Sequence, residues 1–159
     1  MNIENKLGEM GLALPAKPPA AGNYVSAVRT GNLLFVSGHG PALTEDGKVR
    51  YLRGKVGREL TIEQGYEAAR LVALHILRAI KEAVGDLDQV NRFVKVLGFV
   101  NCAEGFQDQP KVINGASDLF VALYGDAGRH ARSAIGMYEL PYGIAVEIEA
   151  IVELKERAS

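Results

Sequence analysis

Arg132 and Glu147 are the two charged residues of this sequence whose types and placement could do chemistry together. A guanidinium stays protonated and holds a carboxylate through two parallel hydrogen bonds, whereas a carboxylate can accept a proton from water. An acidic ligand and a water molecule could therefore sit between them. This requires both side chains to point to the same face of one sheet, so the strands that carry them decide whether the site exists.

The two residues fall in the last two predicted strands, residues 132–139 and 144–154. The Leu140-Pro141-Tyr142-Gly143 segment between them predicts a hairpin turn. In the second strand every even position is apolar, which predicts that this face is buried and that Glu147 lies on the opposite face.

The same alternation predicts the faces of the first strand. Ile135 and Met137 are expected to be buried. The residues left on the other face are Arg132, Ala134, Gly136 and Tyr138. Pairing of Glu147 with either small residue would put its carboxylate roughly 7 to 14 Å from the guanidinium, whereas a shift by one residue would move it to the opposite face.

Two helices are predicted to pack beside these strands. Residues 61–84 have apolar side chains at three- and four-residue spacings, a Thr61-x-x-Gln64 capping box and a terminating Gly85. A second helix is predicted to begin at Pro110 and to end at Gly125.

Further strands are predicted at residues 24–29, 33–37, 49–52 and 93–100. A Thr30-Gly31-Asn32 turn joins the first two into a hairpin. The last of them is apolar on both faces apart from Lys95, which indicates a strand covered on both sides. The order of elements predicts an α+β fold with two helices packed on one mixed sheet.

The N-terminal segment differs from the rest of the chain. Residues 2–10 favour a short helix with Leu7 and Met10 directed inward, and the prolines that follow predict a stiff, extended link. We therefore expect an N-terminal helix and linker over residues 1–21 and a single domain over residues 22–159.

Composition excludes several classes of protein. The 159 residues suffice for one domain, and 18 basic and 19 acidic side chains give a net charge of -1 without a basic run, so no nucleic-acid partner is expected. No apolar run reaches membrane-spanning length, and a single cysteine, Cys102, fits a reducing compartment. We expect a cytoplasmic protein with no membrane partner. His39 and His130 lack partners at metal-ligand spacing, so no metal is expected.

Several segments together resemble the RidA family, also called YjgF-like proteins, over residues 22 to 155. They are Gly22-Asn23-Tyr24-Val25, the Gly31–Gly38 segment, Arg132-Ser133-Ala134, Leu140-Pro141 and Val146-Glu147-Ile148-Glu149-Ala150. Residues 7–12, with Leu14-Pro15, resemble a branch of that family with an extra N-terminal segment. The resemblance implies a chorismate-mutase-like fold of the bacillus type and a homotrimer whose sheets form a central barrel. It also implies ligand clefts between subunits.

The implied activity is hydrolysis of imines or enamines, such as 2-aminoacrylate, to a 2-keto acid and ammonia, without a cofactor. By resemblance, Arg132 grips the carboxylate of the imino acid and Glu147 orients the attacking water. Residues expected to contact the substrate are Tyr24, Ser37, Gly38, Ala134 and, from the neighbouring subunit, Asn114.

Other interpretations remain open at the level of sequence. Ala134 and His39 stand where family members often have cysteine and glutamine, which keeps a carboxylate-binding or sensing trimer without turnover in view. Arg132 could instead form an inter-subunit salt bridge, and Glu147 could be one of several solvated glutamates. His75 is expected to be a packed or surface residue. An endoribonuclease or translation inhibitor, both labels used in the family, fits the near-neutral charge poorly.

Overall fold

The longest helix begins and ends where its local sequence predicts. In the computed structural model, which describes residues 2–157, α2 spans Ile62–Val84. The Thr61 hydroxyl accepts from the Gln64 N–H at 3.1 Å, and the Gln64 side chain accepts from the Thr61 N–H at 2.9 Å. Gly85 ends the helix in a left-handed conformation with φ 85°. Residues 1, 158 and 159 of the predicted segments 1–21 and 22–159 lie outside the described range.

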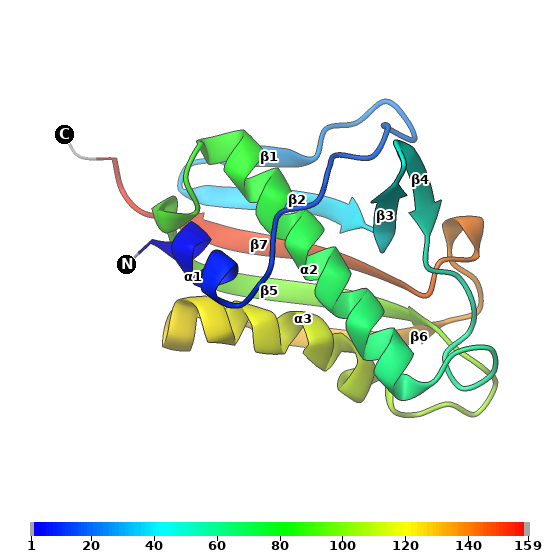
Figure 1. Cartoon of the computed structure of the whole chain (residues 1–159). Helices are drawn as coiled ribbons and strands as arrows, with labels where there is room; N and C mark the ends of the chain where they lie inside the picture. The colour runs from blue at the N-terminus through cyan, green and yellow to red at the C-terminus, as the bar shows by residue number, and fades with distance from the viewer. Residues whose placement is uncertain (1, 158–159) are drawn as a thin grey trace.

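Five strands form the main sheet, in the order β1-β2-β7-β5-β6. Their bounds are Ala27–Thr30 (β1), Leu33–His39 (β2), Val90–Asn101 (β5), Ala131–Met137 (β6) and Val146–Leu154 (β7). Only β5 and β6 pair in parallel; the other neighbours are antiparallel. Figure 1 shows α2 and α3 (Gln109–Tyr124) across one face of this sheet, with α1 (Ile3–Glu9) beside them. The predicted α+β fold with helices on a mixed sheet is confirmed.

A small second sheet lies beyond the end of β2. It consists of β3 (Ala42–Glu45) and β4 (Lys48–Tyr51), of which the sequence predicted only the second. Asp46 and Gly47 both have positive φ, 50° and 75°, which is the turn that a two-residue hairpin requires. Short 3₁₀ turns follow α2 and α3 and precede β7: Leu87–Gln89 (η1), Gly125–Gly128 (η2) and Pro141–Gly143 (η3).

The predicted C-terminal hairpin is wrong, because β5 lies between β6 and β7. A β-α-β unit, β5-α3-β6, makes β6 a parallel neighbour of β5 at the sheet edge, and η3 carries the chain past β5 to β7. Glu147 consequently pairs with Phe99 of β5 instead of with Ala134 or Gly136. The predicted burial of β6 is also reversed, since Ile135 is 43% exposed.

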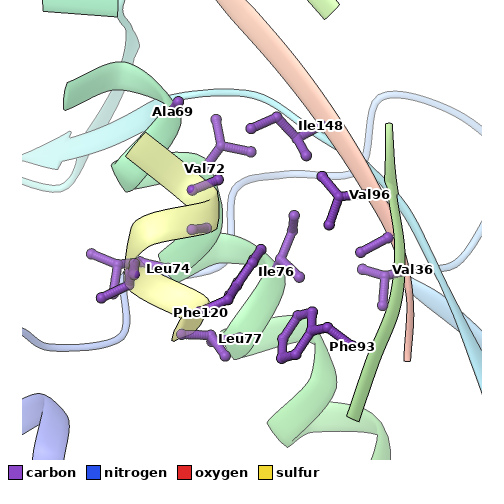
Figure 2. Close-up of a cluster of buried hydrophobic side chains, with 14 of the residues drawn as sticks. Val36, Ala69, Val72, Leu74, Ile76, Leu77, Phe93, Val96, Phe120 and Ile148 are labelled. Atoms are coloured by element: carbon purple, nitrogen blue, oxygen red, sulfur yellow. The ribbon is translucent and has the colours of Figure 1, made fainter. Parts of the chain in front are cut away.

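The core lies between the sheet and the helices. In Figure 2, Val36, Val96 and Ile148 of the strands face Val72, Ile76 and Leu77 of α2. Phe93 and Phe120 stack with ring centroids 4.1 Å apart and join β5 to α3. These apolar side chains are withdrawn from water and supply most of the driving force for folding.

The N-terminal helix adds to this core. In α1, Ile3 and Leu7 are buried, whereas Met10, predicted to point inward, is 40% exposed. The linker that follows crosses over α2 on its way to β1 (Figure 1). Lys17 in this linker forms an ion pair with Glu82 of α2 at 2.5 Å. No helix among the described residues is long and apolar enough to cross a membrane.

The other face of the sheet, here called the open face, carries no helix within residues 2–157 (Figure 1). Its side chains follow from the strand register: Val28, Phe35, Lys95, Leu97, Phe99, Ile135, Glu147, Glu149 and Ile151. Several of these are large and apolar, and Phe35 is 42% exposed. The prediction that β5 is covered on both faces is therefore only half correct: the helices cover one face of β5, and its other face belongs to the open face.

Gly115 sets the distance between α2 and α3. A Cβ atom at this position would lie 2.0 Å from the backbone carbonyl oxygen of Tyr66, so Gly115→Ala must push the helices apart. We expect a loss of about 1 to 3 kcal/mol in the free energy of unfolding, measured by urea denaturation. Gly8→Ala in α1, where a Cβ meets nothing within 4 Å, is the matched control and should be neutral or stabilise by up to about 1 kcal/mol. Equal effects at both positions would contradict this account of the helix contact.

Candidate functional site

Arg132 lies on the helix-covered side of the edge strand β6. It pairs with Val96, which pairs in turn with Ala150, and both of these side chains belong to the core. Its Nη1 donates to Oδ1 of Asn114 at 2.8 Å and to Oγ of Ser117 at 3.1 Å. The guanidinium is therefore anchored to α3.

The anchor continues through a histidine. Ser117 Oγ lies 2.9 Å from Nε2 of His130, and Nδ1 of His130 lies 2.7 Å from the carbonyl oxygen of Gly128. Because a carbonyl only accepts, Nδ1 carries the proton of the neutral ring and Nε2 accepts from the serine hydroxyl. Burial, together with the nearby charge of Arg132, lowers the pKa of His130 despite its backbone hydrogen bond.

Asn114 was predicted as a site residue, but Ser117 and His130 were missed. The signal was present in the spacing: Asn114 and Ser117 are three residues apart on a helix, and His130 and Arg132 are two apart at a strand. The two residues of each pair therefore lie on the same face of their helix or strand. What the sequence could not supply was the packing of α3 against β6.

Ala134 lies on the same face of β6 as Arg132, two residues further along. It pairs with Gly98 and is half-buried against the core. Asn114, expected by resemblance from a neighbouring subunit, bonds to Arg132 within one chain, and Ala134 lies on the same face of β6 as Arg132.

Glu147 lies on the open face, next to the end of β2. A Cβ at Gly38 would lie 2.9 Å from its Oε2, so glycine is the residue that leaves room for the carboxylate. Burial, and then the negative charge of Glu149, raise the pKa of Glu147. A carboxylate with a raised pKa is a better proton acceptor than an ordinary surface glutamate.

Tyr24 and Ser37 lie near the same end of β2. The Ser37 hydroxyl donates to the carbonyl oxygen of Val25 at 2.7 Å, and the Ser37 N–H donates to the carbonyl oxygen of Ser26 at 2.9 Å. Ser37 thus fixes the segment that carries Tyr24, whose side chain is 57% exposed. The Ser37 hydroxyl, expected to contact the substrate, thus bonds to the backbone of its own chain.

The predicted residues therefore form two half-sites. The cationic half-site contains Arg132, Asn114 and Ala134, and the acidic half-site contains Glu147, Gly38, Ser37 and Tyr24. The prediction that Arg132 and Glu147 share a face is wrong, because pairing through β5 gives them opposite parity. One chain cannot bring the guanidinium and the carboxylate onto one ligand.

A cavity of about 380 Å³ lies behind the acidic half-site, between the linker, α2 and the end of β2. His39 lines it and donates from Nδ1 to the carbonyl oxygen of Ser37, 2.6 Å away. Burial outweighs this bond and lowers the pKa of His39 to about 4. His75, also on the wall, is packed, with its Nε2 2.8 Å from the carbonyl oxygen of Ala42. No group of three metal-ligating side chains occurs among residues 2–157.

His39 makes the stability of the fold pH-dependent. Its folded pKa of about 4 lies below the ordinary value of 6.5, so the neutral ring stabilises the fold above pH 6.5 and this contribution is lost as the pH falls towards 4. We expect His39→Gln to remove roughly 3 kcal/mol of the difference in unfolding free energy between pH 7 and pH 4. Urea denaturation across this range measures it. An unchanged acid limb in the variant would contradict the assignment to His39.

The sequence also matches known proteins along most of its length. Residues 4–148 match the family model described as "YjgF/chorismate_mutase-like, putative endoribonuclease". Protein TCP17 of Trypanosoma cruzi is 45% identical over 153 residues, which cover 96% of this chain and 94% of that protein.

Solved structures agree with the sequence match. The crystal structure of Atu1372 from Agrobacterium tumefaciens superimposes with a TM-score of 0.85 at 45% identity, covering 96% of this chain and 94% of the other. RidA from an Antarctic Psychrobacter superimposes with a TM-score of 0.59 at 27% identity, covering 86% and 93% of the two chains. The likeness therefore extends over almost the whole chain in the first structure and over a smaller share of it in the second.

Proposed function

Because this chain belongs to the YjgF/RidA family, we propose that it hydrolyses small 2-imino acids to 2-keto acids and ammonia. The observation that carries the proposal is the pair of half-sites: an anchored guanidinium, and a carboxylate of raised pKa beside a glycine. The first suits the carboxylate of an imino acid, and the second suits activation of water.

The two half-sites require two copies of the chain. Arg132 lies at the sheet edge on the helix side, whereas Glu147 lies on the open face, so a neighbouring copy that contributes Glu147 opposite Arg132 would complete the site. The open face offers the surface for such contact, since its apolar residues Val28, Phe35 and Ile135 are exposed. We propose a homotrimer in which the open faces meet and each cleft lies between two copies.

The chemistry needs few groups. With the substrate carboxylate on Arg132, water attacks the imine carbon and passes a proton to Glu147 as the C–O bond forms. Glu147 returns this proton to the nitrogen, which gives a carbinolamine. It then carries the carbinolamine's hydroxyl proton to the same nitrogen, so that the C=O bond forms as the C–N bond breaks and the keto acid and ammonia are released. Positioning and one base are sufficient for an imine, which is already a reactive electrophile.

Action on RNA is the activity that the words "putative endoribonuclease" in the family description name, and the chain supports it less than imine hydrolysis. The net charge is -1, and Glu147 and Glu149 add negative charge to the open face. A phosphate backbone would be repelled there. The alternative is a protein that binds a carboxylate without turnover, and the kinetic test must distinguish it from a deaminase.

The oligomer can be tested on the open face. Phe35→Lys places a charge where 42% of an aromatic side chain is exposed, and its burial between copies would be strongly unfavourable. We expect light scattering to give three times the chain mass for the native protein and a smaller mass for this variant. Val49→Lys, at an exposed position of β4 outside the main sheet, should retain the native mass. A native monomer at micromolar concentration would exclude a shared site.

The shared site can be tested by complementation. Arg132→Ala should lower kcat/KM for 2-iminopropanoate generated in situ by roughly 10- to 150-fold, because a charged hydrogen bond is lost. Glu147→Gln should lower kcat by about 100-fold or more, because the base is lost. Refolding the two inactive chains together in equal amounts should restore activity in about a quarter of the sites, which combine Arg132 of one copy with Glu147 of another.

Each outcome of that mixture is informative. Restored activity supports a site between copies, and no restoration from folded mixed oligomers would contradict it. Equal keto-acid release by native protein, both variants and buffer would exclude the deaminase. Native protein that binds pyruvate without accelerating hydrolysis would favour a binding or sensing role.

A further inference from the structure

Ser117 and His130 extend the anchor of Arg132 into a chain of hydrogen bonds that runs in one direction. Arg132 Nη1 donates to Ser117 Oγ, Ser117 O–H donates to His130 Nε2, and His130 Nδ1–H donates to the carbonyl oxygen of Gly128. A guanidinium can only donate and a carbonyl can only accept. Both ends of the chain are therefore fixed, and so is every bond between them.

The anchor leaves one edge of the guanidinium for a ligand. Nη1 is used by Asn114 and Ser117, whereas within residues 2–157 the Nε and Nη2 donors of Arg132 make no bond to the protein. These two nitrogens form the edge whose parallel N–H groups match the two oxygens of a carboxylate. The anchor thus selects which edge faces the cleft.

The anchor is also uncharged. Asn114 and Ser117 are neutral, and burial together with the charge of Arg132 lowers the pKa of His130, which keeps its ring neutral at ordinary pH. Arg132 takes part in no ion pair within the described part of the chain. An aspartate or glutamate in the same place would hold the guanidinium as firmly but would neutralise it and compete with the substrate.

We propose that Ser117 and His130 are positioning residues of this site: they hold Arg132 in the orientation that binds a substrate carboxylate bidentately, without neutralising its charge. This inference rests on the proposed function, because it assumes that Arg132 binds a carboxylate. Neither residue needs to touch the substrate. Their contribution is to remove the rotamer freedom of a long side chain at a sheet edge before the ligand arrives.

Matched variants separate the hydrogen bond from the packing. Ser117→Thr keeps a hydroxyl, whereas Ser117→Val has nearly the same shape without one. His130→Phe removes the acceptor but keeps a ring for the edge-on contact with Phe120, whose centroid is 6.0 Å away. Tyr66→Phe removes a different hydroxyl that bonds to α3, at Asp118 at 2.8 Å, and serves as the control.

The readouts are the Kd of pyruvate by calorimetry and the separate kcat and KM for 2-iminopropanoate. We expect Ser117→Val and His130→Phe each to weaken pyruvate binding about tenfold and to raise KM more than they lower kcat, as loss of one hydrogen bond to a charged group predicts. Ser117→Thr and Tyr66→Phe should stay within about twofold of the native protein. The Ser117→Val/His130→Phe double variant should be no weaker than either single variant, because the chain is already broken.

Nitrogen NMR gives a readout that general loosening of the fold would not reproduce. In the native protein, His130 should be neutral with the proton on Nδ1. The Nε–H of Arg132 should exchange with water faster in Ser117→Val than in Ser117→Thr, at equal melting temperatures. Faster exchange with unchanged melting temperature supports positioning; equal exchange in the two variants contradicts it.

The failures can be told apart. Native protein that binds pyruvate while Ser117→Val and His130→Phe bind it equally well would overturn this inference and leave the proposed function standing. Folded native protein that neither binds pyruvate nor accelerates imine hydrolysis would overturn the proposed function and the inference with it.

Discussion

Strand β5 pairs with β6 along one side and with β7 along the other, and this double pairing decides on which face of the sheet each candidate site residue lies. Residues that pair across a sheet share a face, so parity is transmitted from β6 through β5 to β7. Arg132 aligns with Val96 and Ala150, whereas Glu147 aligns with Phe99 and Ile135. The guanidinium and the carboxylate are thereby forced to opposite faces, and a single chain holds only two halves of a site.

The same pairing explains the open face. β5 and β7 have apolar side chains on both faces of the sheet. Those on one face pack under the helices, and those on the open face include Leu97, Phe99 and Ile151. An isolated chain leaves these half-covered, which costs the hydrophobic stabilisation that a second copy would supply. The pairing of β5 with both β6 and β7 thus accounts for the apolar open face and for the separation of the half-sites.

Local chemistry explains which parts of the fold could be predicted. The capping box at Thr61, the glycine stop at Gly85 and the apolar spacing of α2 all act within a few residues, and the structure confirms them. The turn around Pro141 has equally clear local signals, but a turn does not determine which strand its neighbour pairs with. Only the packing of α3 against the sheet, through contacts such as Phe93 with Phe120, places β5 between the two strands.

The site divides along the same line. Residue types and strand alternation identified Arg132 and Glu147, and the family resemblance added Asn114. Neither gave the link from Arg132 to His130, which depends on where α3 meets β6. A histidine two residues before the arginine looked unremarkable because it had no metal partners. Its value lies in being neutral: a half-buried imidazole can complete a hydrogen-bonded anchor while leaving the guanidinium's charge available to a ligand. A search restricted to charged or metal-binding partners therefore overlooks the neutral groups that fix the orientation of an arginine side chain.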